Sequence, residues 1–510
     1  MGEATRPFAE PRRQHAVGLL VLVGWQAQLI LRAAWPLLIA AYVQQEQDAK
    51  YFLWALAAGA VLTVFGAVLH FWRFTFNVQG GKFLVQKGVL VRETVNIPLE
   101  RVQAVHLEQN LIQRLFGVSG LRVDTAGSSG TELRIHALKW EEAQALRGML
   151  TEEHQPTTEE ANESEAGKPL MGLDLPTLLK VGLSQNHLSK VAFAIGGLVT
   201  FQGVAWELMA EIWARVPSLW RTVLTLLSPL FLVFSPVLIA LGAVLISLAT
   251  SVVRHWHLTV WVEGSRARRT GAIHLSQGLF NRQSMQIPLH KVQWVMWENT
   301  WIRRLFSMDT LHIRQASAGG GDVSNQGSAP AAAGGKAMRM GIPAMNARRT
   351  RSMEALLFPE WPARRLMTLR PVRYAFWIRW VKRGLALTPL AVAVGWWLGS
   401  WAGIVVGVMV WAWTGWLSQK AFAGQWATTD GRHLSAHRGW WFRRRVMVDW
   451  TKLQGVELVQ NRIHARRGVA HVTFHTASGV AQLRYLPTEE ARELRDLAMA
   501  TVVAHRGPWM

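Results

Sequence analysis

Three stretches of the chain share one sequence pattern, at residues 88–117, 278–307 and 439–468. Each stretch opens with a glycine, and a proline follows ten positions later in the first two copies. Apolar residues alternate on both sides of that position, as they do in β-strands with one buried face. A unit that recurs in this way predicts three related domains. We expect structural roles for the shared positions Gly88, Pro98, Gln103, Gly117, Gly278, Pro288, Gln293, Gly439, Gln454 and Gly468.

Long apolar segments precede each copy and predict helices that cross a membrane. A straight helix needs about 20 apolar residues to span a bilayer. We expect hairpins of two transmembrane helices at residues 15–72, 191–253 and 375–417. The uncharged part of the third segment, 384–417, suits either two helices or one long tilted span. A Gly-Ser pair at 399–400 offers a turn, and the other two segments set the pattern, so we favour a hairpin.

Each hairpin is followed by a stretch rich in strand patterns that ends in a helical pattern. The sequence therefore predicts a multi-domain α+β membrane protein with six transmembrane helices in three hairpins, each followed by a small β domain with a C-terminal helix. The expected divisions are an N-terminal segment at 1–14, hairpin 1 at 15–72, domain 1 at 73–153, an acidic linker and juxtamembrane helix at 154–190, hairpin 2 at 191–253, domain 2 at 254–361 with a Gly/Ala-rich insertion at 316–340, hairpin 3 at 375–417 and domain 3 at 419–506.

Positive charge is distributed unevenly along the chain, which has 55 Lys and Arg, 33 Asp and Glu and a net charge of +22. Six spans put the three domains and both termini on one side of the membrane. The turns on the other side contain only Lys50, Arg215 and Arg221 among the basic residues, together with four acids. Cytoplasmic loops of membrane proteins are enriched in Lys and Arg. We therefore expect the domains and both termini in the cytoplasm.

The sequence gives little support for a catalytic activity or a bound cofactor. The chain has no cysteine, which excludes disulfides, thiolate metal sites and cysteine nucleophiles. His255 and His257 alternate beside Trp256, but a metal site needs more converging ligands. Glu207 and Glu211 lie one helical turn apart near the end of the third predicted span, where a solvated face explains them. We expect no enzyme activity, no metal and no cofactor.

Basic residues gather next to the third predicted hairpin. Lys and Arg at the cytoplasmic end of a span attract anionic lipids, at roughly 1 kcal/mol each near the surface. The plainer explanation is that these residues only fix the topology. Membrane attachment explains the charge first, so nucleic acid is not an expected partner. The candidate contacts to anionic lipid are Arg364, Arg365, Arg373, Arg379, Lys382, Arg383, Arg443, Arg444 and Arg445.

The first copy has the clearest motifs, IPLERVQAV at 97–105 and NLIQRLFGV at 110–118. With the strands before them and a Gly-broken hairpin after them, these motifs resemble the membrane-flanked bacterial pleckstrin-homology-like (PH-like) family of the YdbS/YdbT type. The layout of three hairpins and three domains is similar to the three-copy YdbT-like members over nearly the whole length. The third copy departs from the pattern, with Asp449 in place of proline and no Leu-Phe-Gly ending.

The resemblance implies that each copy folds as a seven-stranded PH-like barrel of two sheets, closed by a C-terminal helix. It also implies a multi-pass protein of the bacterial inner membrane. Members of the family are linked to resistance against membrane-acting antimicrobials, and some sit beside a smaller relative with a single PH-like domain. Such a relative is one protein partner that the resemblance suggests.

Two functions are compatible with these features. The preferred one is a membrane-anchored scaffold or binding protein that presents three cytoplasmic PH-like domains to a protein, a peptide or an anionic membrane lipid, in cell-envelope stress or antimicrobial resistance. This function is preferred because three repeats are expected on one side of the membrane and because the sequence shows no recognisable set of catalytic residues. The alternative is a component of a transport or export system for a toxic peptide or lipid.

Overall fold

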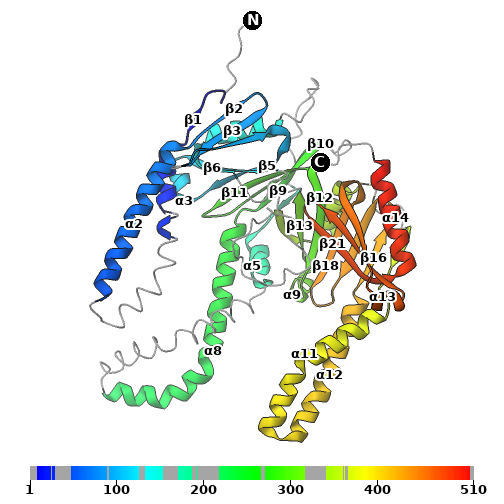
Figure 1. The fold of residues 1–510 in the computed structure, drawn as a ribbon. Helices are drawn as coiled ribbons and strands as arrows, with labels where there is room; N and C mark the ends of the chain where they lie inside the picture. The colour runs from blue at the N-terminus through cyan, green and yellow to red at the C-terminus, as the bar shows by residue number, and fades with distance from the viewer. Residues whose placement is uncertain are drawn as a thin grey trace. The chain divides into compact units, whose positions relative to one another are not determined.

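The chain folds as two compact units that contain the three repeats (Figure 1). The computed structural model describes residues 8–24, 26–28, 48–88, 91–125, 133–152, 170–185, 191, 218–265, 270–315, 340–359, 361 and 366–505. The first unit consists of residues 1–125, 132–261 and 274–286, and the second of residues 126–131, 262–273 and 287–510.

The first repeat has four front strands, three back strands and a closing helix. Its core lies between them, where Phe76, Phe83 and Leu107 are almost fully buried. The 3₁₀ turn η1 (Leu99–Arg101) connects front and back. The other elements are β1 (Arg12–Arg13), α2 (Asp48–Arg73), β2 (Thr75–Gln79), β3 (Lys82–Lys87), β4 (Glu93–Pro98), β5 (Val102–Gln109), α3 (Leu111–Leu115), β6 (Val118–Thr125), β7 (Leu133–Lys139) and α4 (Trp140–Glu152).

The second repeat follows the same order of elements. A short helix, α5, precedes the long apolar helix α8 and packs against it, because Gly182 leaves room for Leu248 and Ser251. The elements are β8 (Met171–Gly172), α5 (Leu175–Leu183), α8 (Ser218–His255), β9 (Thr259–Ser265), β10 (Thr270–Gln277), β11 (Arg282–Pro288), η2 (Leu289–Lys291), β12 (Val292–Asn299), α9 (Trp301–Leu305), β13 (Asp309–Gln315), β14 (Met340–Met345) and α10 (Ala347–Leu357).

The third repeat repeats the order again and is described throughout. Trp450 and Phe474, which stack in its core, are fully buried. The elements are β15 (Met367–Leu369), α11 (Tyr374–Leu398), α12 (Ser400–Ala423), β16 (Trp426–Thr429), β17 (His433–Arg438), β18 (Arg443–Asp449), η3 (Trp450–Lys452), β19 (Leu453–Val459), α13 (Arg462–Arg466), β20 (Val469–Thr476), β21 (Gly479–Pro487) and α14 (Thr488–Ala504).

The apolar segment of each repeat is inserted inside its front sheet. Strand β1 comes before the first apolar segment and pairs with β2, which comes after it. Strand β8 likewise pairs with β9, and β15 with β16. The divisions expected from the sequence at 73, 254 and 419 leave these short first strands outside the domains. Each domain therefore holds its apolar segment between two paired strands.

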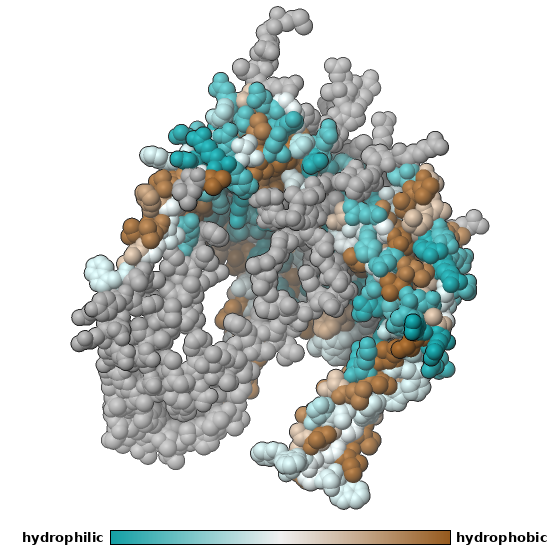
Figure 2. Space-filling view, in the orientation of Figure 1, coloured by the Kyte–Doolittle hydropathy of each residue, from teal (hydrophilic) through white to brown (hydrophobic). Residues whose placement is uncertain are grey.

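The third apolar segment forms two helices. Helix α11 ends at Leu398 and α12 begins at Ser400, and Gly399 between them has φ of +99°. The expected pair of helices with a turn at 399–400 is confirmed, and the second helix is long and apolar enough to cross a membrane. Most of this hairpin is pale or brown in Figure 2, whereas teal residues gather on the domain next to it.

The six expected transmembrane helices are not confirmed by the described residues. Within the described residues, Val237–His255 and Ser400–Ala423 are long and apolar enough to cross a membrane. Shorter apolar helices lie at Val17–Gln28 and Ala57–Arg73. Residues 192–217, which hold most of the third predicted span, lie outside the described residues.

The back strands of one repeat continue into the front sheet of the next. Strand β5 pairs with β11, which makes one sheet in the order β7-β6-β5-β11-β10-β9-β8. Strand β12 pairs with β18 and makes a second, in the order β14-β13-β12-β18-β17-β16-β15. Each repeat has the seven strands that the resemblance implies. The separate two-sheet barrel per repeat is replaced by sheets that neighbouring repeats share.

Candidate functional site

The first glycine of each copy makes a turn between β3 and β4, or their equivalents. Gly88, Gly278 and Gly439 have φ of +107°, +112° and +96°. A Cβ atom at any of the three would collide with the carbonyl oxygen of the residue three positions later. Only glycine fits this conformation without strain, because it has no side chain. The repeated glycine is therefore a requirement of the turn.

In the second and third repeats, this turn contacts the end of the preceding apolar helix. The amide of Gly278 donates to the carbonyl of Trp256 at 2.9 Å, and the amide of Leu279 to that of Val253 at 3.0 Å. These bonds involve the last residues of α8 and those just after it. In the third repeat, a Cβ at Gly424, which follows α12, would lie 2.5 Å from the carbonyl oxygen of Gly439. In both repeats the turn thus lies where the apolar helix meets the sheet, and we call this end of the helix its foot.

The other shared positions also have structural roles. The strand register shifts at Gln103, Gln293 and Gln454, so each is the extra residue of a β-bulge. Six positions later, Gln109 Nε2 donates to the carbonyl of Val118 at 2.9 Å. Its counterpart Gln460 donates in the same way in the third repeat.

The departures in the second and third copies have local explanations. Gly117 and Gly468 have φ of +65° and +63°, and Ser307 adopts φ of +51° at the same place. Asp449 replaces the proline that starts the 3₁₀ turn. Its carboxylate accepts from the Thr451 amide at 3.0 Å and from the Thr451 hydroxyl at 2.7 Å. A side-chain cap thus holds the turn that the proline ring fixes elsewhere.

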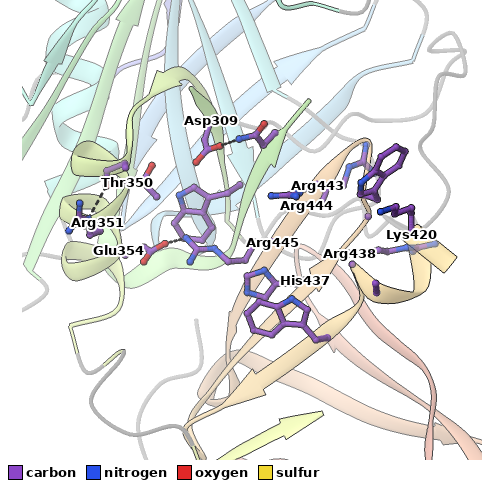
Figure 3. A pocket seen from close by; sticks show the side chains of 18 residues that line it. Asp309, Thr350, Arg351, Glu354, Lys420, His437, Arg438, Arg443, Arg444 and Arg445 are labelled. Carbon is purple, nitrogen blue, oxygen red and sulfur yellow. Dashed lines mark hydrogen bonds and ion pairs between the residues drawn. The ribbon is translucent and has the colours of Figure 1, made fainter. Parts of the chain in front are cut away.

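A cavity of about 760 Å³ opens beside the foot of the third hairpin (Figure 3). Its walls come from α10 and strands β12 and β13 on one side, and from β16 to β18 with the end of α12 on the other. The basic lining residues are Arg351, Lys420, Arg438, Arg443, Arg444 and Arg445, and the acidic ones are Asp309 and Glu354.

Two of these cations are neutralised by carboxylates. Arg445 forms an ion pair with Glu354, and its guanidinium carbon lies 4.4 Å from the ring centre of Trp297. Arg444 pairs with Glu298 at 3.2 Å. The hydrogen bond to His312 is the main reason why the pKa of Glu298 falls to about 2, and the charge of Arg444 lowers it further. Glu298 is therefore an anion at neutral pH.

Other cations of the cavity remain without a carboxylate. Arg438 lies directly opposite Arg444 across the β17–β18 pair, an arrangement that destabilises the sheet unless an anion lies between them. Removal from water lowers the pKa of Arg438, and the charges of Arg484 and Arg444 lower it further. Within the described residues, Arg438, Arg443 and Lys420 have no acidic partner within 4 Å. The cavity therefore has an excess of positive charge.

Aromatic rings connect the cavity to the hairpin. Trp440 packs edge-on against Trp416 of α12, with ring centres 4.9 Å apart. Trp441 lies next to Trp440, contacts Trp301 and is 46% exposed. The Lys420 amine lies 5.9 Å from the Trp416 ring centre. Tryptophan is enriched where a protein crosses from hydrocarbon to water, so this end of the hairpin has the side chains of a membrane interface.

The basic residues that were proposed from the sequence lie in different places in the structure. Arg443, Arg444 and Arg445 lie along β18 at the cavity. Arg379 and Arg383 instead connect α11 to the end of α12. Arg379 bonds to Gln425, and Arg383 bonds to the Ser418 hydroxyl at 3.2 Å. Arg373 and Lys382 are exposed at the start and within the first half of α11, and Arg364 and Arg365 lie outside the described residues.

Sequence reasoning missed Arg351, Lys420 and Arg438. Lys420 was visible as the only charge near the end of an apolar segment. Arg438 directly precedes the repeat glycine Gly439. Its position next to the turn could therefore have been predicted from the place of that glycine in the repeat. Arg351 comes from α10 of the preceding repeat, and no local pattern links it to the site.

The other candidates from the sequence are the histidines near the end of α8 and two glutamates of the third predicted span. His255 bonds to Gln277 at 2.9 Å, and the described residues hold no group of three or more His, Cys, Asp or Glu that could bind a metal. His257 packs against the Trp256 ring. Glu207 and Glu211 lie outside the described residues.

Comparisons with known proteins also find three repeats in the chain. The family model described as "Bacterial PH domain" matches residues 20–154, 219–357 and 374–501. The chain is 22% identical over 331 residues to the UPF0699 transmembrane protein YdbT of Bacillus subtilis (strain 168). That match covers 62% of this chain and 64% of the relative's length. No solved structure matches the chain.

Proposed function

The chain belongs to the bacterial PH-domain family, and we propose that it is a membrane-anchored binding protein whose third repeat binds the anionic headgroup of a lipid. Membrane association is supported by two helices able to cross a bilayer and by the relative's name, a transmembrane protein. The hairpins anchor the chain in the plasma membrane. The PH-like domains and both termini face the cytoplasm, as the distribution of Lys and Arg supports.

The main support for the proposal is a group of basic side chains next to the third hairpin. Three cations, Lys420, Arg438 and Arg443, line a cavity at the foot of a membrane hairpin and have no carboxylate partner within the described part of the chain. Guanidinium groups bind phosphate oxygens through paired hydrogen bonds, and Lys adds a point charge. A phosphate at this place balances the Arg438–Arg444 repulsion. It also lies at the depth where headgroups meet the interfacial tryptophans.

The lipid that such a site selects carries a net negative charge. Each Lys or Arg near an anionic membrane surface contributes roughly 1 kcal/mol of attraction. Three unpaired cations therefore favour an anionic over a zwitterionic headgroup by a factor of about 100, because each 1.4 kcal/mol is tenfold in affinity.

Lipid retention tests the proposal. The full chain is reconstituted in nanodiscs of equal parts phosphatidylglycerol and phosphatidylcholine and released into native mass spectrometry. We expect the wild type to retain phosphatidylglycerol and the double variant Arg438→Gln/Arg443→Gln to retain at least fivefold less of it. The control Arg492→Gln/Arg495→Gln removes the same charge from exposed positions of α14 and leaves retention unchanged.

Two results contradict the proposal. Equal retention by the two double variants shows that total charge, and not the cavity, attracts the lipid. Displacement of phosphatidylglycerol by millimolar inorganic phosphate, with no preference between the two lipids, shows a site for free phosphate. The unfolding temperature of each variant, followed by tryptophan fluorescence, confirms that the compared proteins are folded.

A further inference from the structure

The join between the first and second repeats has a defined register. Strand β5 is antiparallel to β11, and Leu107 lies opposite Ser284. Leu107 comes four residues after the repeat glutamine Gln103, and Ser284 comes four residues before the repeat proline Pro288. Positions at equal distances from these two landmarks therefore face each other.

The join between the second and third repeats obeys the same rule. Strand β12 is antiparallel to β18, and Trp297 lies opposite Arg445. Trp297 comes four residues after Gln293, and Arg445 comes four residues before Asp449, which stands in the place of the proline. Two joins with different side chains thus share one register, so the pairing is a property of the repeat.

Two strand edges that make these joins elsewhere are unused in the described structure. Strand β4 of the first repeat corresponds to β11 and β18, yet it pairs with β3 alone. Strand β19 of the third repeat corresponds to β5 and β12, yet it pairs with β20 alone. An unpaired strand edge presents a row of backbone N–H and C=O groups that can accept another strand.

Side-chain exposure follows the missing pairing. Three positions after the repeat glutamine, Met296 of β12 is 4% exposed and lies opposite Val446 of β18. The equivalent residue of β19 is Glu457, whose side chain is 59% exposed. Two positions before the repeat proline or its substitute, Met447 of β18 is fully buried, whereas Asn96 of β4 is exposed. Within the described residues, both edges are open at positions that are covered in the β12–β18 join.

We propose that β19 of one chain pairs with β4 of a second copy of this chain, in the register that joins the repeats within the chain. Residues 455–459 of one copy then lie opposite residues 97–93 of the other. A second copy fits these edges because β19 corresponds to β5 and β12, and β4 corresponds to β11 and β18, which are the strands that pair at the joins within the chain.

The charges at the two edges are compatible with this register. Glu93 faces Val459, and Glu457 faces Val95, so no like charges lie directly opposite. Each carboxylate also has a partner on its own repeat. Glu93 pairs with Lys87 at 3.3 Å, and Glu457 pairs with His475 at 3.3 Å.

This contact is heterologous, because it joins two different surfaces of the same chain. Head-to-tail contacts generate closed rings when the rotation closes and open filaments when it does not. A membrane-anchored chain with this contact forms rows or rings of PH-like repeats. The inference does not depend on the lipid site of the third repeat.

Disulfide trapping tests the pairing. The natural chain has no cysteine, so every disulfide must form between introduced residues. Four single-cysteine variants are made, Glu93→Cys, Val95→Cys, Glu457→Cys and Val459→Cys. They are co-expressed in pairs with tags of different size and oxidised in native membranes. The matched pairs are 459 with 93 and 457 with 95, and the crossed pairs are 459 with 95 and 457 with 93.

Matched cysteines lie directly opposite each other, about 4.5–5.5 Å apart at Cα. Crossed cysteines are diagonal neighbours at roughly 7–8 Å, beyond the usual reach of a disulfide. We therefore expect at least fivefold more heterodimer from matched than from crossed pairs. Every variant serves in one matched and one crossed pair, so a folding defect lowers both and cannot mimic the result.

Each other outcome overturns the proposal. Equal yields from matched and crossed pairs indicate random collision, and no heterodimer in matched pairs of folded protein excludes the contact. A chain carrying both Glu93→Cys and Val459→Cys is expected to form a ladder of dimers and larger species. A disulfide confined to monomers of that chain means that the two edges pair within one molecule.

Discussion

At the residue scale, the three turn glycines show how one backbone requirement can look like a functional motif. Gly88, Gly278 and Gly439 recur because a side chain collides with the backbone of the same turn. Because the turns of the second and third repeats also contact the end of a membrane helix, strain there affects both the sheet and the hairpin foot.

We predict that Gly439→Ala lowers the unfolding temperature of the full chain in detergent. A non-glycine residue in a strained backbone conformation costs on the order of 1–3 kcal/mol, and the collision with the Phe442 carbonyl adds to this. Gly172→Ala is the matched control, because its Cβ meets no atom within 4 Å. An equal unfolding temperature for both variants contradicts the requirement for glycine at the turn.

The sequence made the repeat positions visible, together with some of the basic residues that line the cavity. The run Arg443–Arg445 was visible in the sequence because its members are adjacent. The cavity is also lined by Arg351 from α10, which tertiary structure brings in from another repeat. The substitution of Asp449 for proline was visible as a departure. Its compensation was not, because a side-chain cap depends on the geometry of the turn.

At the element scale, period and length predicted the two helices of the third hairpin, the strands that follow each apolar segment and the closing helices. The joins between repeats were not predictable, because strand pairing through backbone hydrogen bonds leaves no pattern that names the partner. The first strand of each front sheet was missed for a different reason. Strands β1, β8 and β15 have two or three residues, too few to show a period of two.

The β12–β18 join supplies a test with a definite pH dependence. The pKa of Glu298 is about 2 in the folded protein and near 4.5 when unfolded, so the folded state favours the anion. This shift contributes stability above pH 4.5 that is lost as the pH falls from 4.5 towards 2. A shift of this size corresponds to about 3 kcal/mol.

We predict that Glu298→Gln lowers the free energy of unfolding at pH 7 by about 2–3 kcal/mol, because His312 and Arg444 both lose their carboxylate partner. The difference from the wild type should shrink as the pH falls below 4.5, as measured by urea unfolding followed through tryptophan fluorescence. Glu489→Gln is the control, since that side chain is 88% exposed and its pair with Arg492 lies on the surface. A pH-independent difference contradicts the assigned charge of Glu298.

At the scale of the whole molecule, the third hairpin gives the clearest evidence of how the chain lies in a membrane. Trp396, Trp397 and Trp401 are at least 80% exposed and lie around the turn at Gly399. At the other end of α12, Trp416 and Lys420 lie near the domain. The nineteen helical steps from Trp401 to Lys420 span about 28 Å, close to the thickness of a hydrocarbon core. Tryptophans at both ends suit two membrane interfaces.

This placement predicts opposite sides for two engineered cysteines. The chain has no natural cysteine, Ser400 is exposed in the hairpin turn, and Glu489 is exposed on α14 of the third domain. A membrane-impermeant maleimide applied to spheroplasts should label Ser400→Cys at once and Glu489→Cys only after the membrane is opened. The reason is the asymmetry of charge: Arg379, Lys382 and Arg383 lie in the half of α11 that leads from the domain, and Lys and Arg are retained on the cytoplasmic side. Labelling of Glu489→Cys in intact spheroplasts reverses the proposed orientation, and labelling of both residues there means that α11 and α12 do not cross the membrane.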